Sequence, residues 1–220
     1  MASGKSACQA AVAIVRTTDV ERILVWDWPT RIGHWAMAIA FLVAYITGES
    51  EAWRLVHVWA GGSLAGIVAF RLLWGLIGSR HVRFASFIRS PAAALAYVGS
   101  LLRGRPEHYT GHNPAGGWAI VALLALGLGA AASGWPVYQD IGGEWLGELH
   151  EVAANAMLLL VFIHLAGVVV GSLAHKENLP RAMISGFKLG QPDEAIPGGR
   201  FWAVPLLIVY AVFSAWWLGL

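Results

Sequence analysis

The chain has little charge and almost no cysteine. Of its 220 residues, 13% are charged and 57% are hydrophobic, whereas an average soluble domain has about 25% charged and about 45–50% apolar residues. This shortage of charge excludes an ordinary soluble globule and a disordered chain. A formal net charge of +2 is too small to indicate nucleic-acid binding. The single cysteine, Cys8, excludes an intrachain disulfide, a cysteine-ligated zinc or iron–sulfur site, and a CxxCH motif for covalent haem attachment.

Long hydrophobic runs are abundant instead, and five of them are long enough to span a bilayer, which takes about 20 helical residues. They cover approximately residues 33–47, 55–77, 117–135, 149–173 and 201–220. The spans must be helices, because open sheet edges are not tolerated in lipid. The period-2 alternation of a membrane β-barrel is absent from the sequence. The sequence therefore predicts an all-α integral membrane protein.

The basic residues are distributed unevenly between the two sides of these spans. Thirteen of the fifteen Lys and Arg residues precede the first span or lie between the second and third or the fourth and fifth spans. Of the other two, Arg54 lies on the opposite side and Arg71 lies inside the second span. That opposite side carries the acidic residues Glu49, Glu51, Asp140, Glu144 and Glu148. The positive-inside rule predicts a cytoplasmic N-terminus and a periplasmic C-terminus.

The segments outside the spans have distinct predicted roles. Residues 1–24 are interpreted as a cytoplasmic tail rather than a signal peptide, because the apolar run 7–15 is short and no small-residue cleavage site follows it. In the loop after the second span, Ser90 and Pro91 predict the start of a short amphipathic helix at the membrane surface, near residues 91–103. Residues 25–190 form the predicted membrane domain, and residues 191–200 link it to the last span.

Histidine is the residue type that carries the chemical argument. Of the eight histidines, four are placed in cytoplasmic loops, namely His81, His108, His112 and His175. The other four lie in or at the ends of the predicted spans, namely His34, His57, His150 and His164. A histidine inside a membrane helix is energetically costly and indicates a function by default. Taken singly, each also has a structural interpretation, as a helix cap or a hydrogen bond between helices.

The spacing of the four intramembrane histidines favours a cofactor. His150 and His164 are 14 residues apart, which is about 21 Å along a helix and about 40° short of four full turns. Both imidazoles therefore project from one helix face at two depths. His34 matches the depth of His164 on the cytoplasmic side, and His57 matches the depth of His150 on the outer side. The sequence predicts these two pairs.

At each of the two depths, two imidazoles face each other in a four-helix core. This arrangement could hold two flat macrocycles stacked along the membrane normal. Haem is the natural candidate, because imidazole is a common axial ligand and bundle cores host such cofactors. Zinc fits less well, since a zinc site needs three or four ligands and each pair supplies two. The alternative for the whole protein is a haem-free transporter or scaffold with structural or proton-relay histidines.

Small and basic residues near the histidines extend the predicted site. Gly61 and Gly167, which follow His57 and His164, leave room for a porphyrin, although small residues also serve close helix packing. Arg71 lies 14 residues after His57 and shares its helix face at the depth of the inner haem, where its charge suits a haem propionate. Arg31 lies three residues before His34 and suits the same role. For Arg71, snorkelling to lipid phosphates is an equal alternative.

The sequence resembles the bacterial cytochrome b561 family, especially its branch grouped with the b-type cytochrome subunits of nickel–iron hydrogenases. The resemblance covers roughly residues 23–190 and rests on five segments: WDWPTRIGHW, VHVWAGGSLAGIVAFRLLWGLIGSRHVRF, HYTGHNPAGGW, ELHE and FIHLAG. It implies a four-helix core with two b-type haems, each held by two of the same four histidines. The simplest members have four spans, so the fifth, C-terminal helix departs from the pattern and serves either to dock a partner or to anchor the chain.

The predicted function is electron transfer in the bacterial cytoplasmic membrane, between the quinone pool and a c-type cytochrome or another redox protein. A quinone site is expected at the outer surface near Trp53, Trp59 and Trp145, although such aromatic residues also form interface belts. Two alternatives stay open within redox chemistry: a superoxide:quinone oxidoreductase, and the cytochrome anchor subunit of a hydrogenase or dehydrogenase complex. The mostly acidic outer loops weigh against the binding of superoxide, which is an anion.

Overall fold

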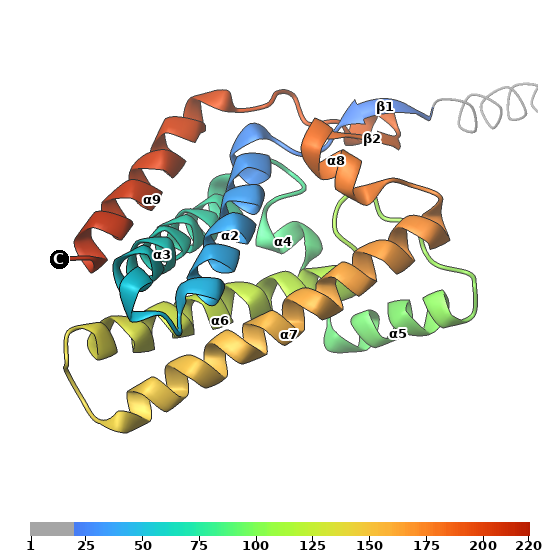
Figure 1. Cartoon of the computed structure of the whole chain (residues 1–220). Helices are drawn as coiled ribbons and strands as arrows, with labels where there is room; N and C mark the ends of the chain where they lie inside the picture. Colours follow the sequence, from blue (N-terminus) through green and yellow to red (C-terminus); the bar gives the residue numbers. More distant parts are fainter. Residues whose placement is uncertain (1–19) are drawn as a thin grey trace, which may run out of the picture.

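The computed structural model describes residues 20–220, which contain five helices long and apolar enough to cross a membrane (Figure 1). They are α2 (Trp28–Thr47), α3 (Arg54–Ile77), α6 (Pro114–Tyr138), α7 (Glu144–His175) and α9 (Val204–Leu218). The 3-10 turns η1 (Glu51–Trp53) and η3 (Phe201–Ala203) directly precede α3 and α9. The predicted all-α membrane class is confirmed.

Most of these helices begin earlier than hydropathy predicts, because polar caps lie outside the apolar runs. The Asp27 side chain accepts a hydrogen bond from the backbone N–H of Thr30 and starts α2. Asn113 caps α6 in the same way, through the N–H of Gly116. Ser90 caps the short helix α5 (Pro91–Leu102), as its Ser-Pro start predicts.

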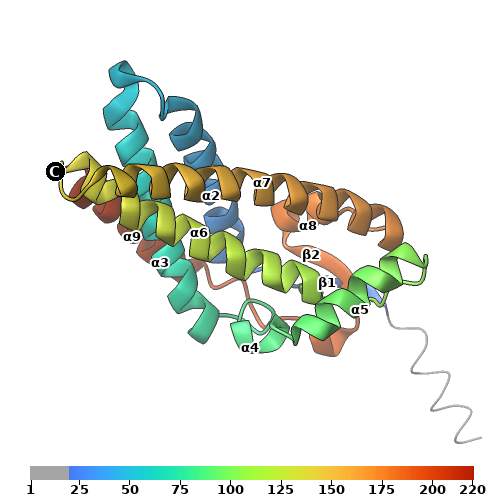
Figure 2. The same cartoon turned by 90° about the horizontal axis from the view of Figure 1, so that it is seen from below.

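The helices form two groups that meet at α3. In the first group, α3 packs against α2 and α9; in the second, α6 packs against α7 along most of its length (Figures 1 and 2). The two groups are joined mainly through α3 and α6, whereas α2 and α7 make no extensive contact with each other. The helices α2 and α7 therefore meet mainly through their side chains.

The fifth membrane helix, α9, packs tightly on the far side of α3. A Cβ atom at Gly62 would lie 2.8 Å from the Cα of Ala215, and one at Gly66 would overlap the Tyr210 carbonyl. The Gly-x-x-x-Gly spacing of Gly62 and Gly66 thus allows the two backbones to approach closely, as is common in membrane helix pairs. Because α9 contacts mainly α3 and makes no extensive contact with α7, it does not lie between α2 and α7.

One end of the molecule carries a small extramembrane cap that the sequence did not predict. Strands β1 (Glu21–Leu24) and β2 (Phe187–Gly190) pair antiparallel, with Glu21 opposite Gly190. Helices α4 (Phe84–Phe87) and α8 (Leu179–Ser185) and the turn η2 (Pro192–Glu194) complete the cap.

Two predicted boundaries therefore change. Residues 21–24, predicted as part of a tail, form a strand, and the predicted linker 191–200 contains η2. Four-residue strands such as Glu21–Leu24 are too short to give a clear alternating pattern. The prediction that no signal peptide is present, and Cys8 itself, lie outside the described residues.

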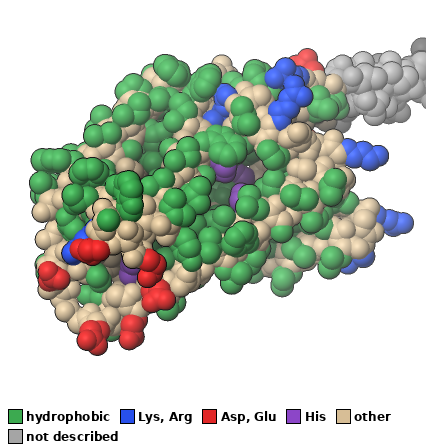
Figure 3. Space-filling view, in the orientation of Figure 1, with side chains coloured by type: hydrophobic (Ala, Val, Ile, Leu, Met, Phe, Trp, Pro, Cys, Tyr) green, Lys and Arg blue, Asp and Glu red, His purple; other side chains and the backbone are tan. Residues whose placement is uncertain are grey.

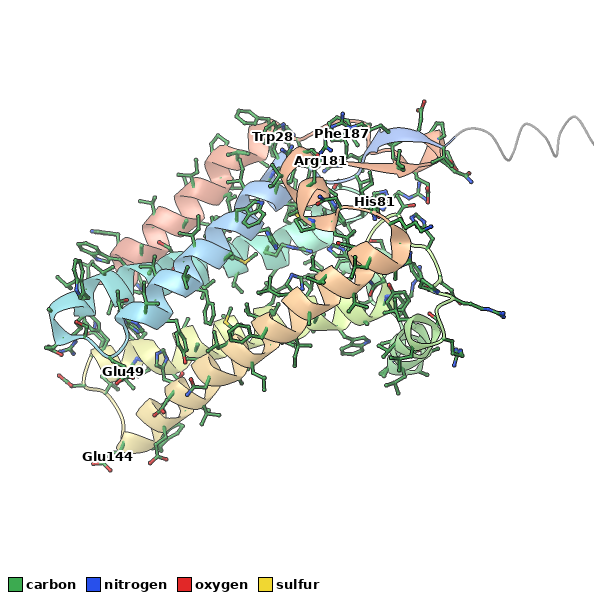
Figure 4. All side chains as sticks on the ribbon, turned by 45° about the vertical axis from the view of Figure 1, so that its right-hand side comes forward. Trp28, Glu49, His81, Glu144, Arg181 and Phe187 are labelled. Atoms are coloured by element: carbon green, nitrogen blue, oxygen red, sulfur yellow. The ribbon has the colours of Figure 1, made fainter. Side chains whose placement is uncertain are left out.

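Charge separates to the two ends of the bundle. Figure 4 places Glu49 and Glu144 at one end and His81, Arg181 and Phe187 at the other. Lys and Arg side chains gather at the second end in Figure 3, Asp and Glu gather at the first, and hydrophobic side chains cover the surface between them. We call these the acidic end, marked by Glu49 and Glu144, and the basic end, marked by Arg181 and the cap.

Candidate cofactor site

The structure brings the four intramembrane histidines together in two pairs. His34 of α2 faces His164 of α7, with ring centroids 6.4 Å apart and an interplanar angle of 55°. His57 of α3 faces His150 of α7, with centroids 5.8 Å apart and an angle of 79°. We call them the basic-end pair and the acidic-end pair. They are the pairs that helix periodicity and depth predict, and His side chains are visible between hydrophobic surfaces in Figure 3.

The spacing within each pair fits a metal ion between the two rings. With metal–nitrogen bonds of about 2 Å and ring nitrogens about 1 Å from the ring centre, two imidazoles on opposite sides of a metal have centroids about 6 Å apart. The observed separations of 6.4 Å and 5.8 Å bracket this value. The separation of the rings in each pair therefore leaves room for one metal ion between them.

Backbone carbonyls orient the acidic-end pair. The Nδ1 of His57 lies 2.8 Å from the Ala44 carbonyl oxygen, and the Nδ1 of His150 lies 2.8 Å from that of Ala130. When each Nδ1–H donates to its carbonyl, the lone pair of Nε2 is free for a metal. Metal-ligating histidines commonly have this second hydrogen bond, which fixes the tautomer and ring direction.

Gly134 makes room for the His150 ring. A Cβ at this position of α6 would lie 2.7 Å from both Cε1 and Nδ1 of His150, which is inside van der Waals contact. The absence of a side chain lets the ring lie against α6 and reach the Ala130 carbonyl. This role of Gly134 was not predicted from the sequence.

The basic-end pair is held differently. Within residues 20–220, the buried Nδ1 of His34 has no hydrogen-bond partner, and its ring packs edge-on against Trp35 with centroids 5.1 Å apart. Between the two pairs lies an apolar layer that includes Phe41, Leu64 and Met157. Met157 is seven residues from each α7 histidine, so this layer separates the two pairs at mid-depth.

The predicted glycines lie beside open space. A Cβ at Gly61 or at Gly167 would meet no other atom within 4 Å. Nearer the acidic end, the Tyr45 hydroxyl donates to the Asn155 side-chain oxygen at 2.9 Å and links α2 to α7. Gly167 is exposed and Gly61 is half-buried, so the open space at Gly167 faces the outer surface of α7.

The two predicted arginines lie at the basic end. Arg71 is only 7% exposed; its Nη2 donates to the Val82 carbonyl, and its Cζ lies 5.2 Å from the Phe84 ring centre. This burial contradicts the alternative that Arg71 snorkels to lipid phosphates. Arg31 donates to the Ile184 carbonyl and packs over the Trp28 ring at 4.1 Å. Among the described residues, Arg71 Nη1 and Arg31 Nε are buried without a hydrogen-bond partner.

The four histidines assigned to loops are more constrained than expected. His81 is buried, and its Nε2 donates to the Glu194 carbonyl at 2.7 Å; burial lowers its pKa, although this hydrogen bond opposes the shift. His175 ends α7 instead of lying in a loop; its Nε2 is 3.1 Å from the Tyr97 hydroxyl, and its ring meets that of His108.

His112 is half-buried between two aromatic rings. Its ring lies 4.6 Å from that of Trp26 and 4.8 Å from that of Phe87, measured between centroids. Burial, with a smaller contribution from the Arg71 charge, lowers the pKa of His112 to about 3. The ring is therefore neutral at physiological pH in this environment.

Comparison with known proteins gives a consistent result. The family model described as "Prokaryotic cytochrome b561" matches residues 25–186. A probable Ni/Fe-hydrogenase B-type cytochrome subunit of Rhodobacter capsulatus is 24% identical over 78% of this chain and 83% of its own. Two proteins of the same description are also similar. The one from Rhizobium leguminosarum bv. viciae is 24% identical over 81% of this chain and 94% of its own length. The one from Cupriavidus necator is 23% identical over 80% of this chain and 91% of its own length. No solved structure gives a significant match.

Proposed function

Because the chain belongs to the prokaryotic cytochrome b561 family, and is thus a multi-pass membrane b-type cytochrome, we propose that it carries electrons between the quinone pool and a redox partner protein through two b-type haems. The proposal rests on one observation: two pairs of imidazole rings face each other at two depths of the bundle, with ring centroids 6.4 Å and 5.8 Å apart. When bound, haem supplies reversible one-electron chemistry.

The residues divide the task of holding the cofactors. His34 and His164 are the proposed ligands at the basic end, and His57 and His150 those at the acidic end. If both histidines of a pair bound one haem iron, they would leave no open position for a substrate, and electrons would pass to partners that do not bind the metal. Arg31 and Arg71 carry unpartnered buried nitrogens in the described part of the chain and suit haem propionates.

The apolar layer between the pairs excludes water from the bundle centre. Leu64 and Val68 of α3 and Met157 of α7 are buried there. Such a layer lowers the local dielectric and keeps protons and solvent away from the cofactors. The chain therefore supplies an insulated path with one site near each membrane surface.

We place the basic end in the cytoplasm and the acidic end in the periplasm. The gathering of Lys and Arg at one end of the bundle supports this orientation under the positive-inside rule. The acidic residues Asp140, Glu144 and Glu148 at the other end suit a basic redox partner, whose approach their charge would steer. Trp53, Trp59 and Trp145 are exposed there and are the proposed flank of the quinone site.

A second candidate is the cytochrome subunit that anchors a hydrogenase-like complex. The similar proteins are described as probable Ni/Fe-hydrogenase B-type cytochrome subunits, and the match covers 83% and 94% of the length of two of them, which favours this candidate. In this case the catalytic centre belongs to another polypeptide. Superoxide oxidation is disfavoured by the acidic end, where carboxylates repel an anion.

Substitution of the α7 histidines tests the haem sites. In purified full-length protein, we expect His150→Ala and His164→Ala each to lower the haem content measured by pyridine haemochrome from about two to about one per chain. The haem left in each variant should have a different midpoint potential. His108→Ala, in an exposed loop, is the matched control and should keep both haems.

Quinone chemistry needs a separate assay. Stopped-flow mixing of the oxidised, haem-loaded protein with a quinol should reduce haem rapidly. If quinol fails to reduce haem and quinone fails to oxidise it, the proposed exchange with the quinone pool is wrong, whatever the haem content.

A further inference from the structure

The basic end contains buried polar atoms that the four ligand histidines do not explain. Among residues 20–220, Arg71 Nη1, Ser79 Oγ and His112 Nδ1 are each inaccessible to solvent and without a hydrogen-bond partner. Arg71 is 7% exposed and Ser79 only 1%. Leaving buried polar groups without a hydrogen-bond partner is costly, most of all when they are charged. A cluster of such groups therefore indicates that a further group binds there.

The side chains of Arg71 and His112 meet around the Phe87 ring, and Ser79 lies in the turn that Arg71 bonds. The Arg71 Cζ lies 6.0 Å from the Phe87 ring centre, and the His112 ring centroid lies 4.8 Å from the same ring. Arg71 Nη2 donates to the Val82 carbonyl at 3.2 Å, and the Val82 N–H donates to the Ser79 carbonyl at 3.0 Å, within one turn. Arg71 is also close enough to contribute to the lowered pKa of His112.

No carboxylate in the described residues forms an ion pair with Arg71. The nearest candidate, Asp27, accepts hydrogen bonds from the N–H and hydroxyl of Thr30 and from the Trp74 indole N–H at 3.1 Å. Its two oxygens are thus engaged on the α2 cap. A buried guanidinium needs an anionic partner, and a carboxylate is the group whose geometry it matches best.

The cluster lies at the depth of the basic-end pair. His34 is six residues from the start of α2 and Arg71 six residues from the end of the neighbouring α3, so each is about 9 Å from the same surface. His112 directly precedes the cap of α6, and its ring also contacts Trp26, which lies just before α2. Arg71 and His112 therefore lie at the end of the bundle that carries His34, at a similar depth.

We propose that Arg71 and His112 together hold one propionate of the haem at His34 and His164, with His112 donating through its imidazole N–H. The inference rests on the proposed haem ligation and adds His112, a histidine outside the four ligands, as a positioning residue. Arg71 provides the charge, and His112 provides a neutral donor that fixes where the carboxylate lies. The hydroxyl of Ser79, in the adjoining turn, is a third donor at this end.

The test measures the midpoint potential of each haem in the full-length, haem-loaded protein. His112→Phe keeps an aromatic ring against Trp26 and Phe87 but removes the donor. We expect both haems to be retained while the midpoint potential of one falls, because a propionate without its donor stabilises the ferric state. His112→Asn restores an N–H donor and should recover most of the shift. Arg80→Gln, an exposed cation on the same turn that bonds the Asp193 carbonyl, should leave both potentials unchanged.

Reconstitution separates a propionate from other anions. In protein loaded with haem dimethyl ester, whose propionates are esterified, His112→Phe should no longer shift either potential. A shift of equal size with the ester, or no shift with natural haem, would overturn the proposal. Inorganic phosphate tests for a soluble anion. If added phosphate changes the midpoint potential of the unmodified protein but not that of His112→Phe, the site binds a soluble anion and the proposal is wrong.

A double substitution gives a second readout. If Arg71 and His112 hold the same carboxylate, the shift in Arg71→Gln/His112→Phe should be smaller than the sum of the single shifts. Additive shifts would place the two residues on different groups. Failure of the proposed haem ligation itself is distinguishable, since it appears as missing haem and not as an altered potential.

Discussion

Substitution of Gly134 by Ala tests whether α6 positions His150. The added Cβ would lie 2.7 Å from Cε1 and Nδ1 of the His150 ring. Favourable carbon contacts lie at about 3.5–4.0 Å, so the ring must move by about 1 Å. A displacement of this size lengthens the 2.8 Å contact with the Ala130 carbonyl beyond hydrogen-bonding range. Loss of such an outer hydrogen bond to a metal-ligating histidine typically lowers metal affinity by about 10–100-fold.

Gly129→Ala is the matched control on the same helix. A Cβ at Gly129 meets no atom within 4 Å, so this change brings the same gain in helix propensity without the collision. We expect Gly134→Ala to weaken retention of the acidic-end haem during washing with apomyoglobin as haem acceptor, while the basic-end haem stays. Equal haem retention in Gly134→Ala, Gly129→Ala and the unmodified protein would refute the role assigned to Gly134.

Three further substitutions test the packing of the fold. Gly66→Ala should lower the melting temperature in detergent without loss of haem, because the new Cβ overlaps the Tyr210 carbonyl of α9; an unchanged melting temperature would contradict the close α3–α9 contact. Lys188 is buried and bonds Glu177 at 3.1 Å, so Lys188→Met should cost about 3–5 kcal/mol by isothermal denaturation, and adding Glu177→Leu should recover most of it. Burial lowers the pKa of His81 in the folded state, so its contribution to cap stability is complete above the unfolded pKa of about 6.5 and declines as the pH falls below it. The hydrogen-exchange protection factors of the β2 amides should therefore fall with acid, and His81→Gln should reduce this pH dependence.

Hydropathy and helix periodicity predicted the membrane helices and the histidine pairing. Long apolar runs have few alternatives to helix in lipid, so the five spans follow from composition. The 14-residue interval between His150 and His164 places both on one face of α7, and the two partners on α2 and α3 follow from depth. The helix ends were less accurate, because caps such as Asp27 and Asn113 are polar residues outside the apolar runs.

The details around the site depend on contacts between distant segments. Gly134 matters because His150 lies over it, and nothing in the local sequence separates it from the glycines that meet open space. His112 looked like an ordinary loop residue, yet Trp26 and Phe87 enclose it. The pairing of β1 with β2 joins residues more than 160 positions apart in the chain, with Glu21 opposite Gly190. Such contacts follow from tertiary packing, which short sequence windows do not contain.

The most direct test of the central claim is the haem content of the purified full-length protein. The account predicts a b-type reduced-minus-oxidised spectrum, about two haems per chain by pyridine haemochrome, and complete extraction of both by acidified acetone, since neither is covalently attached. The low-spin ferric signals expected of two histidine-ligated haems should appear by electron paramagnetic resonance. A haem-free protein, or a single haem per chain that survives both His150→Ala and His164→Ala, would contradict it.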